Sequence, residues 1–220
     1  MKWMIASDLH GSYFYASQMQ QAFEREQADR LLLLGDLLYH GPRNDLPEGY
    51  APKQVMPLLN SMKDRLLCVR GNCDAEVDQM VLEFPVLADY AVLPVGRRLV
   101  YATHGHVYNT KTPPPMAPGD ILLHGHTHIP AWEPFGQGSF YLNPGSVSLP
   151  KEGSAHSYMT LENGCFRWKT MDAVWRNAAS TTNTSAAQTS IKSTAERGNA
   201  SVTAMRRSTP SVRCVSRKVG

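Results

Sequence analysis

The sequence predicts an α/β fold in which two mixed β-sheets pack together and are flanked by helices. In the first half, short apolar runs alternate with stretches of helical periodicity, which is typical of parallel strands joined by crossover helices. In the second half, strand-like runs are separated by turn residues, with little helical periodicity between them. Two stacked mixed sheets are the simplest architecture that accommodates both halves.

The first half contains three strand-like runs and two helical stretches. They are a strand at 2–7, a helix at about 12–27, a strand at 30–34, a helix that begins near residue 52, and a strand at 65–69. The loop over residues 37–50 is long and rich in Gly, Pro and Asn, so we expect it to border the functional site. Pro57 falls inside the second helical pattern and predicts a kink or a short helix.

The second half contains six short runs of strand-forming residues. They lie at 86–93, 98–103, 121–124, 139–142, 158–162 and 166–171. The hydrophobic content of the chain, 42%, is enough for a real core. We therefore expect one folded domain over residues 1–175.

Residues 176–220 differ in composition from this domain. Of the 44 residues from 177 to 220, 8 are Ser, 7 are Thr, 7 are Ala and none is aromatic, so we expect a disordered tail. The tail over 176–220 carries 8 Lys and Arg residues against 1 acidic residue, whereas residues 1–175 carry 14 against 18. The basic character of the chain thus comes from the tail, and a basic arm that binds nucleic acid or another anionic partner is the alternative interpretation.

The sequence shows no targeting signal and no membrane span. Lys2 precedes an apolar run that reaches Asp8 after only a few residues, and no run approaches the ~20 apolar residues that cross a bilayer. The four cysteines form no CxxC pair and have no regular spacing, which fits a reducing compartment. We expect a cytoplasmic protein that does not bind membranes.

Five apolar runs end in side chains that can bind metals. These side chains are Asp8 and His10, Asp36, Asn72, His104, and the pair His126 and His128. Polar groups just past the carboxyl ends of neighbouring strands converge on one crevice, so the five runs predict a single site. One such motif alone would be weak, because Asp8 could equally cap the following helix.

The histidines are concentrated near the end of two of these runs. Five of the eight fall within 25 residues and lie beside glycines: His104, His106, His124, His126 and His128. Crowded imidazoles without a metal would repel one another when protonated. Carboxylates, imidazoles and an amide together exceed what one ion needs and suit a pair of divalent ions that perform hydrolysis.

In this order the motifs resemble those of the calcineurin-like metallophosphoesterase superfamily. They are Asp8-x-His10, Gly35-Asp36, Gly71-Asn72-x-Asp74, His104-Gly105-His106 and Gly125-His126-x-His128. Within that superfamily, four further stretches at 40–44, 46–50, 71–80 and 143–148 are similar to the bacterial YfcE-type phosphodiesterases. The resemblance covers about residues 1–172 and ends before the tail.

The resemblance implies a four-layer α/β/β/α sandwich, the metallophosphoesterase fold, with a dimetal centre. Carried over by motif, the ligands of one ion would be Asp8, His10 and His128, those of the other Asn72, His104 and His126, with Asp36 bridging both. A hydroxide held between the two ions would attack phosphorus in line. The ions expected are Mn²⁺, although the ligand set also accepts Zn, Fe or Ni.

Two further residues enter the predicted catalytic set beside Asp36 and Asn72. Cys73 stands where the wider superfamily has a histidine that helps to protonate the leaving group, so the proton donor is unassigned, and a covalent role for the thiol lacks a base. Arg43 could bind phosphate from the long loop or simply pair with Asp45 or solvent. Residues 143–146 are interpreted as shaping the rim of the site, with no chemistry of their own.

The function predicted from these residues is metal-dependent hydrolysis of small phosphodiesters. A phosphomonoesterase or nuclease would use the same ligands, but the acidic domain disfavours long nucleic acids, which need a positive track. A non-catalytic scaffold, like the retromer subunit that shares this fold, is the third alternative, yet every ligand position is filled here. The sequence leaves the oligomeric state open, and a homo-oligomer is compatible with it.

Overall fold

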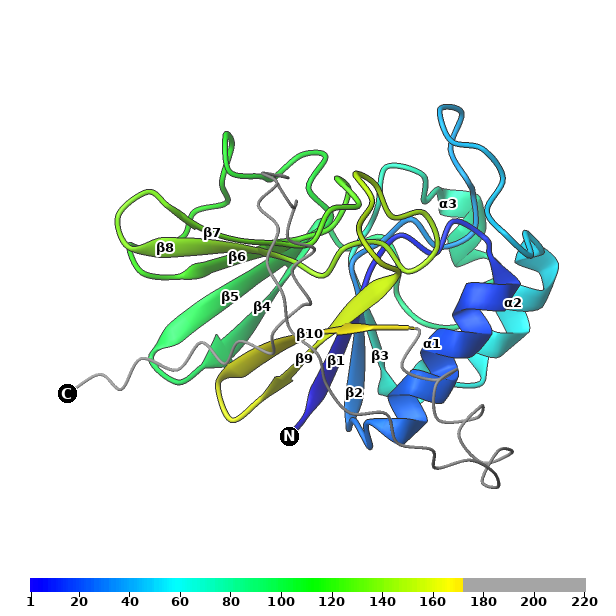
Figure 1. Cartoon of the computed structure of the whole chain (residues 1–220), viewed down its shortest axis with the longest axis horizontal. Coiled ribbons are helices and arrows are strands. Elements are labelled where there is room, and N and C mark those ends of the chain that lie inside the picture. The colour runs from blue at the N-terminus through cyan, green and yellow to red at the C-terminus, as the bar shows by residue number, and fades with distance from the viewer. Residues whose placement is uncertain (172–220) are drawn as a thin grey trace, which may run out of the picture.

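The protein stacks two five-stranded mixed β-sheets face to face (Figure 1). The structure, a computed structural model, describes residues 1–171, and the predicted tail at 176–220 lies outside the described residues. The first sheet contains, in spatial order, β10 (Cys165–Thr170), β9 (Ser157–Glu162), β1 (Trp3–Ala6), β2 (Arg30–Leu33) and β3 (Leu66–Cys68). The second contains β4 (Tyr90–Val95), β5 (Arg98–Thr103), β6 (Ile121–His124), β8 (Ser139–Asn143) and β7 (Ala131–Phe135).

Each sheet combines parallel and antiparallel strands. In the first, β1, β2 and β3 are parallel, and β9 and β10 add antiparallel strands beside β1. In the second, β5, β6 and β8 are parallel, with β4 and β7 as antiparallel edge strands. The predicted pair of mixed sheets is therefore confirmed, and loops that follow parallel strands of both sheets carry the candidate ligands.

The helices lie on the outer side of the first sheet (Figure 1). They are α1 (Tyr13–Arg25), α2 (Pro52–Asn60), the four-residue α3 (Glu76–Gln79) and a 3₁₀ turn at Lys63–Arg65. The α2 helix has nine residues and contains Pro57, in agreement with the short helix expected there. Residues 1–171 contain no other helix.

Three elements differ from the expected ones. The strand expected at 86–93 begins only at Tyr90, and β7 and α3 were not predicted. β7 contains Pro134 and three exposed residues, because it is an edge strand with solvent on one side. Its alternation of apolar and polar residues is therefore weak.

The core has two layers, and β2 contributes to both. Leu31 and Leu33 pack against the helices, whereas Leu32 packs between the sheets against Val100 and Leu123. This alternation follows from the two-residue period of a strand that is buried on both faces. In the described part of the chain, no helix has the length and hydropathy of a membrane span.

We predict that Leu32→Ala lowers the free energy of unfolding by about 2 to 5 kcal/mol, because Leu32 is fully buried between the sheets. The control Leu46→Ala removes the same atoms from a side chain that is 61% exposed, and should change the free energy of unfolding by less than about 0.5 kcal/mol. Urea unfolding followed by circular dichroism measures both. Equal losses in the two variants would contradict the assignment of Leu32 to the intersheet core.

Candidate metal centre

Five of the seven predicted ligands have left-handed backbone conformations. The φ angles are 61° at Asp8, 46° at His10, 57° at Asp36, 67° at His126 and 64° at His128. Only three other non-glycine residues among residues 1–171 have positive φ. Such conformations cost about 1 to 3 kcal/mol each and persist only where the surroundings fix them. Backbone strain is therefore concentrated at the predicted site.

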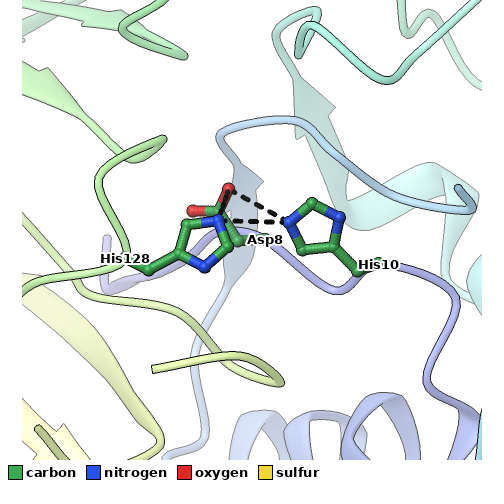
Figure 2. A group of neighbouring side chains, drawn as sticks. All are labelled: Asp8, His10 and His128. Atoms are coloured by element: carbon green, nitrogen blue, oxygen red, sulfur yellow. Dashed lines mark hydrogen bonds and ion pairs between the residues drawn. The ribbon is translucent and has the colours of Figure 1, made fainter. Parts of the chain in front are cut away.

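Asp8, His10 and His128 form the first group of candidate ligands (Figure 2). Asp8 Oδ1 lies 3.3 Å from His128 Nε2 and 3.7 Å from His10 Nε2, and the two Nε2 atoms are 3.2 Å apart. All three residues are buried. The Asp8 Oδ1 atom has no hydrogen-bond partner within the described residues, although it is buried.

Asp36 connects this group to the second sheet. Its Oδ2 lies 3.7 Å from His10 Nε2 and 3.4 Å from His104 Nε2. Its Oδ1 accepts a hydrogen bond of 2.8 Å from the backbone N–H of Cys73, which fixes the rotation of the carboxylate. Because His10 follows β1 and His104 follows β5, one oxygen atom faces an imidazole from each sheet.

Asn72, His104 and His126 form the second group. His104 Nε2 lies 3.1 Å from Asn72 Oδ1 and 3.1 Å from His126 Nδ1. His104 is fully buried, His126 is partly buried and Asn72 is exposed, so this group reaches solvent. The structure thus brings all seven predicted ligands together around Asp36, from loops that follow five different strands.

Backbone carbonyls fix the orientation of three of the four imidazoles. His10 Nδ1 donates to the carbonyl of Tyr39 at 2.9 Å, His104 Nδ1 to that of Leu34 at 2.7 Å, and His128 Nδ1 to that of Leu149 at 2.6 Å. A carbonyl only accepts, so the proton sits on Nδ1 and each neutral ring presents the Nε2 lone pair to the cluster. This arrangement is typical of histidines that bind metals.

Burial and charge separate the pKa values of the imidazoles. Burial and the nearby His104 lower the pKa of His126 to about 4, and burial also lowers that of His10. Burial opposes protonation of His104 as well, but its hydrogen bond to Asp36 and the charge of Asp8 raise its pKa to about 9. The metal-free cluster therefore holds one proton between His104 and Asp36.

The donor set fits a pair of divalent ions. Two Nε2 lone pairs and an unpartnered carboxylate oxygen converge in the first group, and this convergence is costly unless a cation lies among them. Asp36 shares one oxygen with both groups. Imidazole nitrogens with carboxylate and amide oxygens suit Mn, Fe, Zn or Ni rather than Ca²⁺ or Mg²⁺.

Comparison with known proteins places this geometry in a family. Residues 1–164 match the model of the calcineurin-like phosphoesterase superfamily domain. The chain belongs to this superfamily. It is 45% identical over 163 residues to the phosphodiesterase YfcE of Escherichia coli K12, a match that covers 74% of this chain and 88% of the relative.

Solved structures of other proteins share the fold. The structure of the phosphoesterase YfcE from E. coli matches with a TM-score of 0.75 and 43% identity, over 79% of this chain and 94% of that one. Chaetomium thermophilum Vps29 matches with a TM-score of 0.51 and 16% identity, over 76% of this chain and 86% of that one. The second similarity extends to the fold alone.

Cys73 lies beside the carboxylate of Asp36 in this phosphoesterase domain. Its thiol is half-buried and accepts a hydrogen bond of 3.2 Å from Asn72 Nδ2. Burial and the neighbouring Asp36 raise the pKa of Cys73 to about 12. The thiol is therefore protonated at neutral pH in the metal-free chain, which disfavours the covalent alternative considered for it.

Arg43 does not join the cluster. The residue is exposed, and within the described residues it forms neither a hydrogen bond nor an ion pair, with Asp45 or with any ligand. Its loop nevertheless borders the site, since Tyr39 contacts His10 through its carbonyl and a Cβ added to Gly41 would lie 3.1 Å from Cys73 Sγ. The expectation that the 37–50 loop borders the site is thus confirmed.

Asp74 holds two ligand loops of the phosphoesterase site and was noticed in the sequence only as part of a motif. Its Oδ2 accepts the backbone N–H groups of Asp36 at 2.8 Å and Gly71 at 2.7 Å, and its Oδ1 accepts that of Leu37 at 2.8 Å. Burial raises its pKa to about 6. One carboxylate therefore ties the loop of Asp36 to the loop of Asn72.

Ser146 and Ser148 support Asp8, the first of the candidate ligands. Both hydroxyls donate to the backbone carbonyl of Asp8 at 2.9 Å, and the backbone N–H of Val147 bonds the carbonyl of Ser7 at 3.0 Å. Residues 143–146 were expected only to shape the rim of the site. The hydroxyls instead hold the strained peptide of Asp8. This role depends on contacts between segments that are distant in the sequence, so the sequence alone does not reveal it.

We predict that Asp74→Asn weakens Mn²⁺ binding by about 10 to 100-fold, because an amide NH₂ would face at least one of three N–H groups that now bond the carboxylate. Calorimetric titration of metal-free protein with Mn²⁺ measures the affinity. The control Asp45→Asn makes the same change in the exposed loop, where Asp45 has no ion pair or hydrogen bond among the described residues. Unchanged affinity in Asp74→Asn would contradict the clamping role.

We also predict that metal loading releases about one proton per chain at about pH 8. Asp36 keeps His104 protonated with a pKa of about 9, and a ligand imidazole must lose this proton. The affinity for Mn²⁺ should accordingly fall as the pH falls below that value. Titrations in two buffers of different ionisation enthalpy count the protons, and equal enthalpies in both would contradict the prediction.

Proposed function

We propose that this protein is a metal-dependent phosphodiesterase that hydrolyses small phosphodiesters. One observation carries the proposal, namely that Asp36 Oδ2 lies 3.7 Å from His10 Nε2 and 3.4 Å from His104 Nε2. A carboxylate shared in this way is what two neighbouring divalent ions require. The name of the 45% identical E. coli relative, a phosphodiesterase, supports the choice of reaction.

The residues of the chain would divide between two ions, with Mn²⁺ as the proposed metal. One ion would be held by Asp8, His10 and His128, and the other by Asn72, His104 and His126. Asp36 would be a ligand of both ions. Bound there, the ions would supply Lewis acidity that lowers the pKa of water and offsets charge on the phosphoryl oxygens. The chain keeps the ligands fixed through backbone hydrogen bonds, so little reorganisation is needed on binding.

No side chain of the cluster is suited to be the nucleophile. The Cys73 thiol has a raised pKa of about 12, and the carboxylates of Asp8 and Asp36 face imidazoles. Asn72 is exposed beside them and can contact the phosphoryl group from the solvent side. Arg43 is free of other partners in the described region and could bind phosphate if the 37–50 loop moves. Activated water is therefore the proposed nucleophile.

The size of the substrate is inferred from charge. Residues 1–175 carry 14 basic and 18 acidic residues, so the domain offers no net positive charge to a long nucleic acid. A small diester needs only the cations of the site itself. A phosphomonoesterase, a nuclease and a scaffold such as Vps29 are the competing functions, and a substrate panel separates them.

We predict that the Mn²⁺-loaded protein hydrolyses an aryl phosphodiester faster than an aryl phosphomonoester or single-stranded DNA. Asp36→Asn should lower the rate at least about 100-fold, because it removes charge from the ligand that both ions share. Absorbance of the released phenol gives the rates on the two aryl esters, for the parent protein and for Asp36→Asn. Faster monoester or DNA cleavage would replace the proposed substrate class, and inactivity on every substrate would favour the scaffold.

We further predict that Cys73→His raises turnover most on diesters with poor leaving groups. An imidazole can donate a proton to the departing oxygen, whereas the thiol of Cys73 is a weak donor. Turnover of an alkyl diester and of an activated aryl diester is compared in the variant and the parent. An equal change on the two substrates would argue against a missing proton donor.

A further inference from the structure

Cys73 forms a third group of potential ligands inside the cluster. Its Sγ, a nitrogen of His10 and an oxygen of Asp36 all lie within 4.8 Å of one another. His10 and Asp36 also belong to the two groups described above. The thiol thus lies beside the bridging carboxylate, close enough to share an ion with it.

The position of the thiol is fixed by its neighbours. The backbone N–H of Cys73 donates to Asp36 Oδ1 at 2.8 Å, and Asn72 Nδ2 donates to Sγ at 3.2 Å. On the other side, the loop at Gly41 closes over the sulfur, since a Cβ added there would lie 3.1 Å from Sγ. These contacts hold the sulfur close to the carboxylate and leave it half-buried.

The sulfur differs in chemistry from every other ligand of the cluster. Thiolates bind soft ions such as Zn²⁺ and Cd²⁺ strongly, whereas Mn²⁺ prefers carboxylate and carbonyl oxygens. Imidazole accepts either class of ion. A site that offers His10, Asp36 and Cys73 together therefore selects for thiophilic cations, while the rest of the cluster, which offers only nitrogen and oxygen atoms, does not.

We propose that Cys73 is a conditional metal ligand, which binds a thiophilic cation such as Zn²⁺ or Cd²⁺ together with His10 and Asp36 and stays a thiol when Mn²⁺ is bound. This inference rests on the proposed dimetal site. On binding, the S–H bond breaks, the proton passes to solvent, and a sulfur–metal bond replaces a water molecule on the cation. No oxidation or reduction takes place.

Binding of a thiophilic cation by Cys73 and binding of the proposed Mn²⁺ pair should exclude each other. A thiophilic cation held by Cys73 takes His10 and Asp36, the same two residues that the proposed Mn²⁺ pair needs. Bound Cd²⁺ should therefore exclude Mn²⁺ from the bridging position. The residue at position 73 thereby affects which metal the site binds, in addition to the protonation of the leaving group.

Absorption spectroscopy of the Co²⁺-loaded full chain tests the proposal directly. Co²⁺ bound by imidazole and carboxylate gives weak visible bands, and a thiolate ligand adds an intense charge-transfer band in the near ultraviolet. We expect both sets of bands in the parent protein. Cys73→Ser should keep the visible bands and lose the near-ultraviolet band, whereas the control Cys68→Ala, at the free cysteine buried in β3, should keep both.

The spectrum separates failure of this proposal from failure of the proposed dimetal site. Visible bands without a near-ultraviolet band in the parent, or a near-ultraviolet band that persists in Cys73→Ser, would overturn the role of Cys73 alone. Absence of all bands would overturn both proposals. Cd²⁺ competition against Mn²⁺ provides a second measurement, in which Cys73→Ser should weaken Cd²⁺ about ten-fold or more relative to Mn²⁺, and an unchanged ratio would overturn the proposal.

Discussion

The site depends on one carboxylate oxygen that faces both sheets. Asp36 Oδ2 lies within 3.7 Å of an imidazole after β1 and within 3.4 Å of an imidazole after β5. These distances can hold only if the two sheets stack with their strand ends in register, so the intersheet core around Leu32 and Leu123 sets the geometry of the cluster. Packing and the geometry of the cluster are therefore coupled through β2, which contains Leu32 and is followed by the loop that carries Asp36.

The surroundings of the cluster explain how strained residues are tolerated. Asp8 and Asp36 both have positive φ, which the local sequence does not favour. Asp74 receives the peptide N–H groups around Asp36, while Ser146 and Ser148 bond the carbonyl of Asp8. The conformational cost is thus offset by hydrogen bonds from segments far away in the sequence, and the candidate ligands are held in place by the fold itself.

The sequence predicted the fold class and the candidate ligands, because both leave local signals. An apolar run that ends in Asp36 or His104 marks a strand and a ligand at once. The edge strand β7 and the short α3 left no such periodicity, and the roles of Asp74 and Ser146 arise only where distant loops meet.

The central claim is that two metal ions share Asp36, and electron paramagnetic resonance of the Mn²⁺-loaded protein tests it most directly. Two ions bridged by one carboxylate would lie ~3.5 to 4 Å apart and couple magnetically. The account predicts two Mn²⁺ ions per chain and a multiline spectrum from a coupled pair. A single ion per chain, or two ions with the six-line spectrum of isolated Mn²⁺, would contradict it.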